Sequence, residues 1–174
     1  MNAVPVLLSD ALTTVINTAV TAEEFETLGF TAERSYPDWD DDFSDLKSLA
    51  VDVVYVSSAD AAGDEIELDS YGTIDTTPAV DISVRKRFGH ADRARPGAST
   101  GRISNTAIDP LVRLVEQLYE TMTADRITAI ELAAGISANW METSVRTYCD
   151  YGRLRQGNFL GVIRVRFDVS RANG

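Results

Sequence analysis

The clearest feature of the hydrophobic pattern is a strict alternation near the end of the chain. From Ile163 to Val169, every second side chain is apolar and the side chains between them are polar or charged. This period of two is typical of a β-strand with one face in the core. It predicts a strand from Phe159 to Val169. The two faces of this strand are Ile163, Val165, Phe167 and Val169 on the apolar side, and Arg164, Arg166 and Asp168 on the other.

A partner strand is predicted just before this one, from Trp140 to Cys149. The segment between the two strands, Asp150 to Asn158, contains glycine, asparagine and aspartate residues that favour turns. Together the two strands would form an antiparallel hairpin. Because a lone hairpin is only marginally stable in water, a covering layer is required.

Four further segments have strand character. Phe30 to Tyr36 is short, and Glu65 to Ile74 is polar enough to be an edge strand or an ordered loop. Leu49 to Val56 is apolar on both faces, which favours a central position in a sheet. Val80 to Phe88 alternates clearly. Its two faces are Val80, Ile82, Val84 and Phe88 on one side, and Asp81, Ser83, Arg85 and Arg87 on the other.

Two segments have the spacing of amphipathic helices. Pro5 to Val20 repeats apolar residues every three or four positions, and Pro110 to Met122 does the same after Asp109, which suits an N-cap. We expect the second helix to cover the hairpin. Ile127 to Ala134 suits a shorter helix or a descending turn. The apolar stripe of the first helix consists of Leu8, Leu12, Val15, Ile16 and Ala19.

Two loops stand out between these elements. The acidic loop at residues 37–45 carries Trp39 and Phe43, which either close the edge of the core or bind a partner. Its run of consecutive aspartates lacks the alternating pattern of a calcium loop. Residues 89–106 are rich in Gly, Ser and Arg, and we interpret them as a mobile basic arm that becomes ordered on assembly.

Charge is distributed unevenly along the chain. The net charge is −11, but residues 1–81 hold 18 acidic and 2 basic side chains, whereas residues 82–174 hold 9 acidic and 14 basic ones. An acidic chain is a poor general binder of nucleic acid. The asymmetry favours docking between copies, acidic face against basic face. The alternative is that both halves mix on one folded surface.

No motif indicates catalysis, a metal or a cofactor, so we expect a protein that is not an enzyme. The 174 residues suit a single domain, and no segment has the length and apolar character of a membrane span or a secretory signal. Cys149, the only cysteine, is interpreted as a small apolar residue in a strand rather than a nucleophile. His90, the only histidine, has no second ligand or nucleophile near it in sequence.

The order of the segments carries a family resemblance. An N-terminal helix is followed by five segments: Phe30 to Pro37, Asp45 to Val54, the strand Val80 to Phe88, the helix Pro110 to Met122, and a closing hairpin that ends in Phe159 to Val165. This series resembles the small tail-completion proteins of tailed bacteriophages, in particular the tail-terminator or neck class. The long basic arm departs from that pattern.

The resemblance implies an α+β subunit with two main helices on one face of a mostly antiparallel sheet. Such subunits form a homohexameric ring in the virion, which caps the tail tube and joins it to the head connector, so that tail tube and head-completion proteins are the partners. DNA passes through the ring without specific binding. A head-to-tail contact uses two different patches of each subunit.

Two sets of residues are assigned to this assembly as hypotheses. Subunit or partner contacts are assigned to Trp39, Phe43, Arg85, Arg87, Arg153, Arg155, Arg164 and Arg166. The channel surface is assigned to Asp38, Asp40, Asp41 and Asp42. The alternatives are another neck protein, such as a head-completion or stopper protein, and a small cellular α+β domain with a ligand under the arm.

Overall fold

The computed structural model describes residues 4–25, 28–35, 43, 46, 48–56, 67–68, 74–75, 77–95, 101–123, 127, 129–133 and 135–171. The helices are α1 (Val4–Thr21), the 3₁₀ helix η2 (His90–Asp92), α2 (Asn105–Thr121) and α3 (Tyr151–Arg155). The strands are β1 (Ala32–Ser35), β2 (Ala50–Val56), β3 (Glu67–Leu68), β4 (Ile74–Asp75), β5 (Ala79–Arg87), β6 (Ala129–Ala133), β7 (Ile136–Thr147) and β8 (Asn158–Arg171). None of these helices is long and apolar enough to span a membrane.

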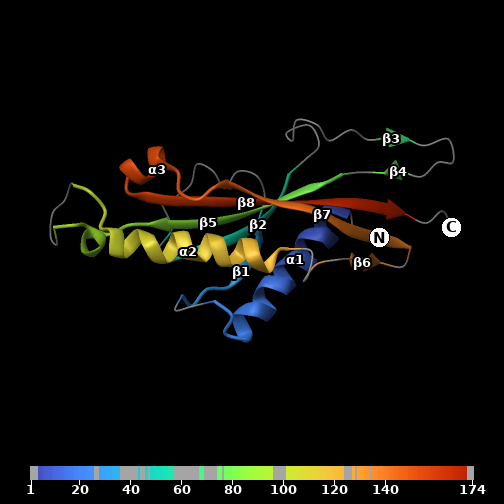
Figure 1. Ribbon diagram of the computed structural model, residues 1–174, viewed down its shortest axis with the longest axis horizontal. Helices are drawn as coiled ribbons and strands as arrows, with labels where there is room; N and C mark the ends of the chain where they lie inside the picture. The colour runs from blue at the N-terminus through green and yellow to red at the C-terminus, as the bar shows by residue number, and fades with distance from the viewer. Residues whose placement is uncertain are drawn as a thin grey trace.

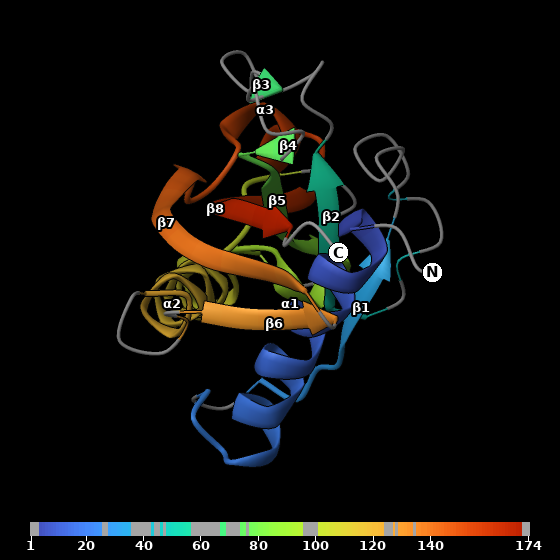
Figure 2. The same ribbon diagram turned by 90° about the vertical axis from the view of Figure 1, so that its right-hand side faces the viewer.

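The main sheet of the described residues has the order β1-β2-β5-β8-β7-β6. Only the β1–β2 pair in this sheet is parallel, and the other pairs are antiparallel. The sheet curls so that α1 and α2 lie inside the curve (Figures 1 and 2). This arrangement confirms the predicted α+β class. The short strands β3 and β4 pair separately.

One hydrophobic core lies between the helices and the concave face of the sheet. Four residues of the predicted stripe on α1, namely Leu8, Leu12, Ile16 and Ala19, are buried in it, and Val15 packs against it. The buried side chains of α2 are Leu111, Leu114, Val115, Leu118 and Thr121. Both amphipathic patterns therefore faced the core as expected.

The closing hairpin is present as predicted. Strand β7 pairs antiparallel with β8, and α2 packs over β8 as its cover. All four residues assigned to the apolar face of β8 are buried, with exposed fractions of 1% or less. Strand β7 carries bulges between Trp140 and Glu142 and between Val145 and Thr147. Such bulges increase local twist, which suits the curl of the sheet around α2.

The first strand is fixed to the first helix by a two-way hydrogen bond. The side chain of Asn17 in α1 donates to the carbonyl of Ala32 at 3.0 Å and accepts from its N–H at 2.8 Å. Among the described strands, β1 lies at the edge of the sheet and pairs only with β2. The side chain of Asn17 therefore satisfies the outward-facing N–H and carbonyl of Ala32 in this edge strand.

The prediction of a helix or turn at Ile127 to Ala134 is wrong. Residues 129–133 form β6, which pairs with β7 through a tight turn at Gly135, where φ is 77°. The segment alternates half-buried Ile130 and Leu132 with exposed Glu131. Pairing with β7 outweighs the weak helical tendency of so short a segment.

The predicted start of the second helix is also wrong. Helix α2 begins at Asn105, and Pro110 lies inside it instead of at its first position. The carbonyl of Ser104 accepts hydrogen bonds from Ala107 and Ile108, which closes a first turn upstream of Asp109. Pro110 has no N–H, so it removes one intrahelical hydrogen bond. The loss lies near the N-terminal end of the helix, where the first N–H groups already lack intrahelical partners.

The described parts of the basic arm are paired with each other. Ala94 donates its N–H to the carbonyl of Arg102 at 2.9 Å, and Ser104 donates to Asp92 at 2.8 Å. Ile103 is buried in the core at 3% exposure. Both ends of the arm are thus fixed to the domain. The arm was predicted to be mobile, and its residues 96–100 lie outside the described residues.

Candidate functional site

The second face of the sheet carries a buried layer of charge. Arg85 of β5 donates to Asp52 of β2 through Nε at 3.0 Å and Nη2 at 2.8 Å. Arg164 of β8 donates to both carboxylate oxygens of Asp81, at 2.7 and 2.9 Å. The side chains of these four residues are only 9–12% exposed. The alternating pattern of β5 and β8 suggested that their charged side chains face solvent, but these two ion pairs are largely buried.

The register of the strands explains why these charges meet. Asp81 lies directly opposite Arg164, whereas Asp52 lies opposite Ser83 and reaches Arg85 diagonally. Cross-strand neighbours at such positions are close enough to interact. The ion pairs therefore tie β2, β5 and β8 together. Arg85 and Arg164, both assigned to subunit contacts, are engaged within their own chain.

Phe43 is buried in a small apolar cluster that is separate from the main core. It is 5% exposed and packs against Leu160 and Val162 on the same second face of the sheet. Two guanidinium groups lie near its ring, with Cζ of Arg85 at 5.9 Å and Cζ of Arg153 at 5.6 Å from the ring centroid. Such cation–π contacts stabilise the position of Phe43 on this face. Trp39, Asp38, Asp40, Asp41 and Asp42 lie outside the described residues.

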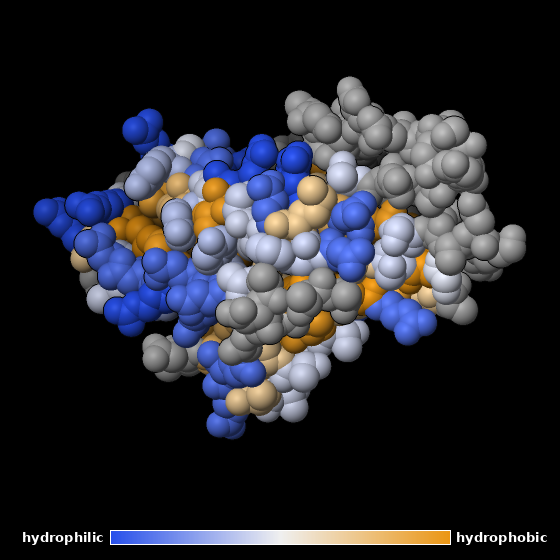
Figure 3. Space-filling model, turned by 45° about the vertical axis from the view of Figure 1, so that its right-hand side comes forward, coloured by the Kyte–Doolittle hydropathy of each residue, from blue (hydrophilic) through white to orange (hydrophobic). Residues whose placement is uncertain are grey.

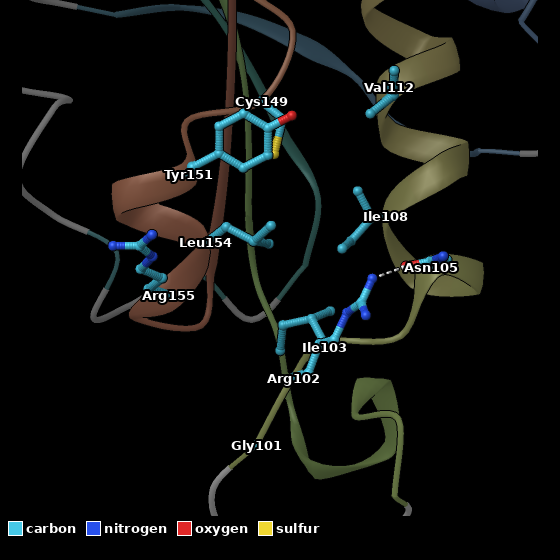
Figure 4. A pocket seen from close by; sticks show the side chains of 10 residues that line it. All are labelled: Gly101, Arg102, Ile103, Asn105, Ile108, Val112, Cys149, Tyr151, Leu154 and Arg155. Carbon is cyan, nitrogen blue, oxygen red and sulfur yellow. Dashed lines mark hydrogen bonds between the residues drawn. The ribbon is translucent and has the colours of Figure 1, made fainter.

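A cavity of about 660 Å³ opens at the α3 end of the molecule. It lies between the first turns of α2, the short helix α3 and the returning end of the arm (Figure 4). Its described apolar lining consists of Ile103, Ile108, Val112, Cys149 and Leu154. A volume in this range with a mainly apolar lining is typical of binding sites.

The mouth of the cavity is aromatic and basic. Tyr151 is 75% exposed, and Arg102 and Arg155 are exposed too. Arg155 lies on the α3 side of the cavity with Tyr151, and Arg102 lies near Asn105 at the start of α2 (Figure 4). Arg102 donates to the side-chain oxygen of Asn105 at 3.2 Å. The positive end of the α2 dipole adds to the positive potential. The mouth therefore favours an apolar group that carries negative charge nearby.

Helix α3 is held firmly enough to shape this mouth. Asp150 is its N-cap and accepts the N–H of Arg153 at 2.9 Å, and the N–H of Asp150 itself donates to Leu160 at 2.9 Å. The chain leaves the helix through Gly157, whose φ of 83° suits glycine and whose carbonyl accepts the N–H of Phe88 at 2.8 Å. These bonds join α3 to β5 and β8.

Cys149 lies in the cavity and not within a strand, because β7 ends at Thr147. Its sulfur faces the cavity (Figure 4). Burial raises the pKa of this thiol, and the negative charge of Asp150 raises it further. The thiol form is therefore dominant at neutral pH, which gives no support to a nucleophilic role.

Basic side chains gather at this end of the molecule. Arg87, Arg95, Arg102 and Arg155 are exposed, and Lys86, Arg93 and Arg153 are half-buried. The nearby carboxylates of Asp92 and Asp150 both accept backbone N–H groups. Figure 3 shows the resulting hydrophilic surface around an apolar patch. We name residues 86–95, 101–104 and 150–157 the basic end.

The opposite end of the sheet has the other charge. Glu131, Glu142 and Asp168 are exposed there, on β6, β7 and β8. Arg166, which was assigned to subunit contacts, forms an ion pair with Glu142 at 3.7 Å and offsets part of this charge. Figure 1 places β6 and the C-terminal end of β8 at the opposite extreme of the sheet from α3, and Glu142 lies midway along β7. We name the region around these three carboxylates the acidic end.

The structure brings together only some of the predicted residues. Arg87, Arg153 and Arg155 lie at the basic end, whereas Arg166 lies toward the acidic end. The residues that pattern analysis missed are Ile103 and Tyr151. Ile103 was hidden in a segment interpreted as a mobile arm, and an isolated tyrosine in a turn gives no periodic signal.

Among the described residues, no group of three or more His, Cys, Asp or Glu side chains is arranged to hold a metal ion. No protein-family model matches the chain, and no curated protein matches it significantly. We therefore argue function from the fold, the two charged ends and the cavity.

Proposed function

We propose that this chain is a structural subunit of a tailed bacteriophage, a tail terminator that assembles into a ring at the junction of tail tube and head connector. The α+β fold with both main helices inside a curled sheet is the fold that the resemblance implies. The homohexameric state, the virion location and the tail partners belong to this proposal.

The observation that carries the proposal is the separation of charge along the hairpin. The basic end exposes Arg87, Arg102 and Arg155, and the acidic end exposes Glu142 and Asp168. A subunit with two unlike, complementary ends suits a head-to-tail contact, which closes into a ring when the rotation between copies allows it. The two halves of the sequence also mix in part, since Asp52 pairs with Arg85 and Asp81 pairs with Arg164.

In the proposed ring, DNA passes through the lumen without lasting contact. An acidic lumen repels phosphate and prevents the release of counterions that gives protein–DNA complexes their affinity. We assign this surface to Asp38, Asp40, Asp41 and Asp42. Arg155 takes part in the contact between copies, because it is exposed at the basic end.

Electron microscopy of the purified chain mixed with phage tail tubes tests the proposal. The expected result is a ring at one end of the tube, with nothing along its length. A protein seen only on the head connector would instead support a head-completion or stopper role. Absence of the chain from tubes, tube ends and connectors would contradict both neck assignments.

The cavity favours one candidate function of a different class. A ligand-binding domain would bind its ligand there, since the returning end of the arm, Arg102 and Ile103, forms part of the wall. Light scattering separates the two functions. The ligand-binding domain would be favoured if the chain remains a monomer with tail tubes present. It would also be favoured if a small amphipathic anion changes the fluorescence of Tyr151.

A further inference from the structure

Large apolar side chains are exposed at the middle of strand β7 and just beyond its C-terminal end. Among the described residues these are Met141, at 48% exposure, and Tyr148 and Tyr151, at 46% and 75%. Tyr151 belongs to the basic end and borders the cavity, and Tyr148 directly follows β7. Met141 lies at the middle of β7, between Trp140 and Glu142.

The exposure of Met141 follows from a bulge. Trp140 is paired with Phe167 and Glu142 with Arg166, which leaves Met141 as the extra residue without a partner in β8. Bulges redirect a side chain that would otherwise alternate into or out of the sheet. Here the redirected side chain is long, flexible and apolar, and such residues adapt to irregular cavities.

The surroundings of the two features are complementary. Exposed Glu142 follows Met141 directly in sequence, and Asp168 and Glu131 are exposed on the neighbouring strands. The cavity has an apolar lining and two exposed guanidinium groups at its mouth, from Arg102 and Arg155. Methionine also makes favourable sulfur contacts with aromatic rings, and Tyr151 offers one at the mouth.

We infer that the cavity beside α3 receives Met141 of a second copy of this chain, with Glu142 of that copy meeting Arg102 and Arg155. The inference rests on the proposed self-assembly and names the contact that carries it. A second copy suits this site because Met141 offers an exposed apolar side chain directly beside an exposed carboxylate, that of Glu142, and the mouth of the cavity is basic.

This contact is heterologous, because the cavity and Met141 are two different patches of each subunit. Two copies joined in this way leave one unused cavity and one unused methionine, so that further copies add in the same direction. The geometry produces a closed ring or an open chain of subunits. Arginine, tyrosine and methionine are also the residue types enriched at the centres of protein interfaces.

Disulfide trapping tests the contact directly, because Cys149 is the only cysteine and lies in the cavity. A tagged Met141→Cys/Cys149→Ser variant is mixed with the untagged native chain under mild oxidation. The matched control places the cysteine on the exposed α2 residue Arg113, as Arg113→Cys/Cys149→Ser. The expected result is a tagged–untagged dimer that forms at least about tenfold faster with Met141→Cys than with the control.

A mixing experiment tests the head-to-tail arrangement on exposed residues, where substitution does not disturb folding. Met141→Asp removes the inserted side chain, and Tyr151→Asp/Arg155→Glu alters the mouth. In sedimentation at high protein concentration or with tail tubes, each variant alone should fail to assemble. Their mixture should stop at dimers, since one intact cavity and one intact methionine remain. Arg113→Glu, a control charge reversal, should assemble like the native chain.

The outcomes separate this inference from the proposed function. Rings on tail tubes together with equal trapping rates for Met141→Cys and Arg113→Cys would overturn the contact and leave the tail function standing. Selective trapping at Met141 without any binding to tail tubes would support the contact and count against the tail function. A small anion that protects Cys149 from alkylation in the Met141→Asp variant would identify the cavity as a ligand site and also overturn the inference.

Discussion

Gly161 of β8 lies directly beneath Val115 of α2. A Cβ atom added to this glycine would come within 2.5 Å of Cγ2 of the valine and 3.1 Å of the carbonyl oxygen of Tyr148. Both distances are shorter than ordinary contacts, and one neighbour is backbone that cannot turn away. The close approach of the helix to the sheet therefore depends on the absence of a side chain at this position.

Gly161→Ala should destabilise the fold by about 1–3 kcal/mol, because it forces extra volume into a packed core. Urea unfolding measures the change in free energy. Val115→Ala in the same chain removes the clashing methyl groups, so that the double variant should lose less stability than the sum of the two single changes. Simple additivity would show that the helix does not rest on Gly161.

Breaking the buried ion pair should cost more than breaking an exposed one. Asp52→Ala takes the carboxylate from Arg85, in a pair whose side chains are about one-tenth exposed, and should cost about 3–5 kcal/mol. The matched control is Asp10→Ala, which breaks a pair with Arg34 whose side chains are 55% and 34% exposed, and should cost no more than about 1 kcal/mol. Equal losses in thermal or urea unfolding would contradict the structural role of the Asp52–Arg85 pair.

The two-way hydrogen bond of Asn17 should be sensitive to a change of one atom. Asn17→Asp keeps an acceptor for the N–H of Ala32 but loses the donor for its carbonyl. We expect a loss of about 1–3 kcal/mol, because the carbonyl of a half-buried strand edge is left unsatisfied. Hydrogen exchange at Ala32 should accelerate in Asn17→Ala and change less in Thr14→Ala, one turn earlier on α1. Unchanged exchange would show that β1 does not need this bond.

The reactivity of Cys149 should depend on pH in a specific direction. Burial, and then the charge of Asp150, raise the pKa of the thiol. Alkylation of Cys149 at pH 8 should therefore be slower than in the unfolded chain, and the alkylation rate should increase at a higher pH than it does there. Asp150→Asn removes the charge but keeps an N-cap, so the rate should increase by up to about tenfold. A rate unaffected by Asp150→Asn would leave burial as the only cause.

The same raised pKa affects stability. The folded state favours the neutral thiol, so this contribution is fully present below the ordinary thiol pKa and is lost as pH rises through the raised one. Cys149→Ser should therefore flatten the decline of stability on the alkaline side. Unfolding midpoints measured on both sides of the ordinary thiol pKa check this expectation.

Strong periodic patterns in the sequence identified most of the fold. The alternation of Ile163 to Val169 and the stripe of Leu8, Leu12 and Ile16 each gave the correct element and the correct buried face. Residues 129–133 were misassigned because their pattern is short and pairing with β7 decides their conformation. The start of α2 was missed because Asp109-Pro110 is a strong local signal, whereas Ser104 acts through its backbone carbonyl.

The candidate site was less accessible to sequence reasoning. Arg85, Arg155 and Arg164 appear alike in sequence, yet register places Arg85 and Arg164 in buried ion pairs and leaves Arg155 exposed. The cavity is lined by residues 101–103, residues 149–155 and α2, and no local sequence pattern predicts that these three segments come together. The bulge at Met141 likewise depends on the pairing with β8.

The place of β8 in the sheet has a consequence for synthesis of the protein. This strand follows all the others in the chain, yet it lies between β5 and β7 and joins the two halves of the sheet. While the ribosome makes residues before Asn158, β5 therefore waits with one edge open and the apolar face of α1 lacks a finished core. Folding of the main sheet is thus a late event, and nascent chains stalled before β8 should be protease-sensitive and prone to aggregate until that strand emerges.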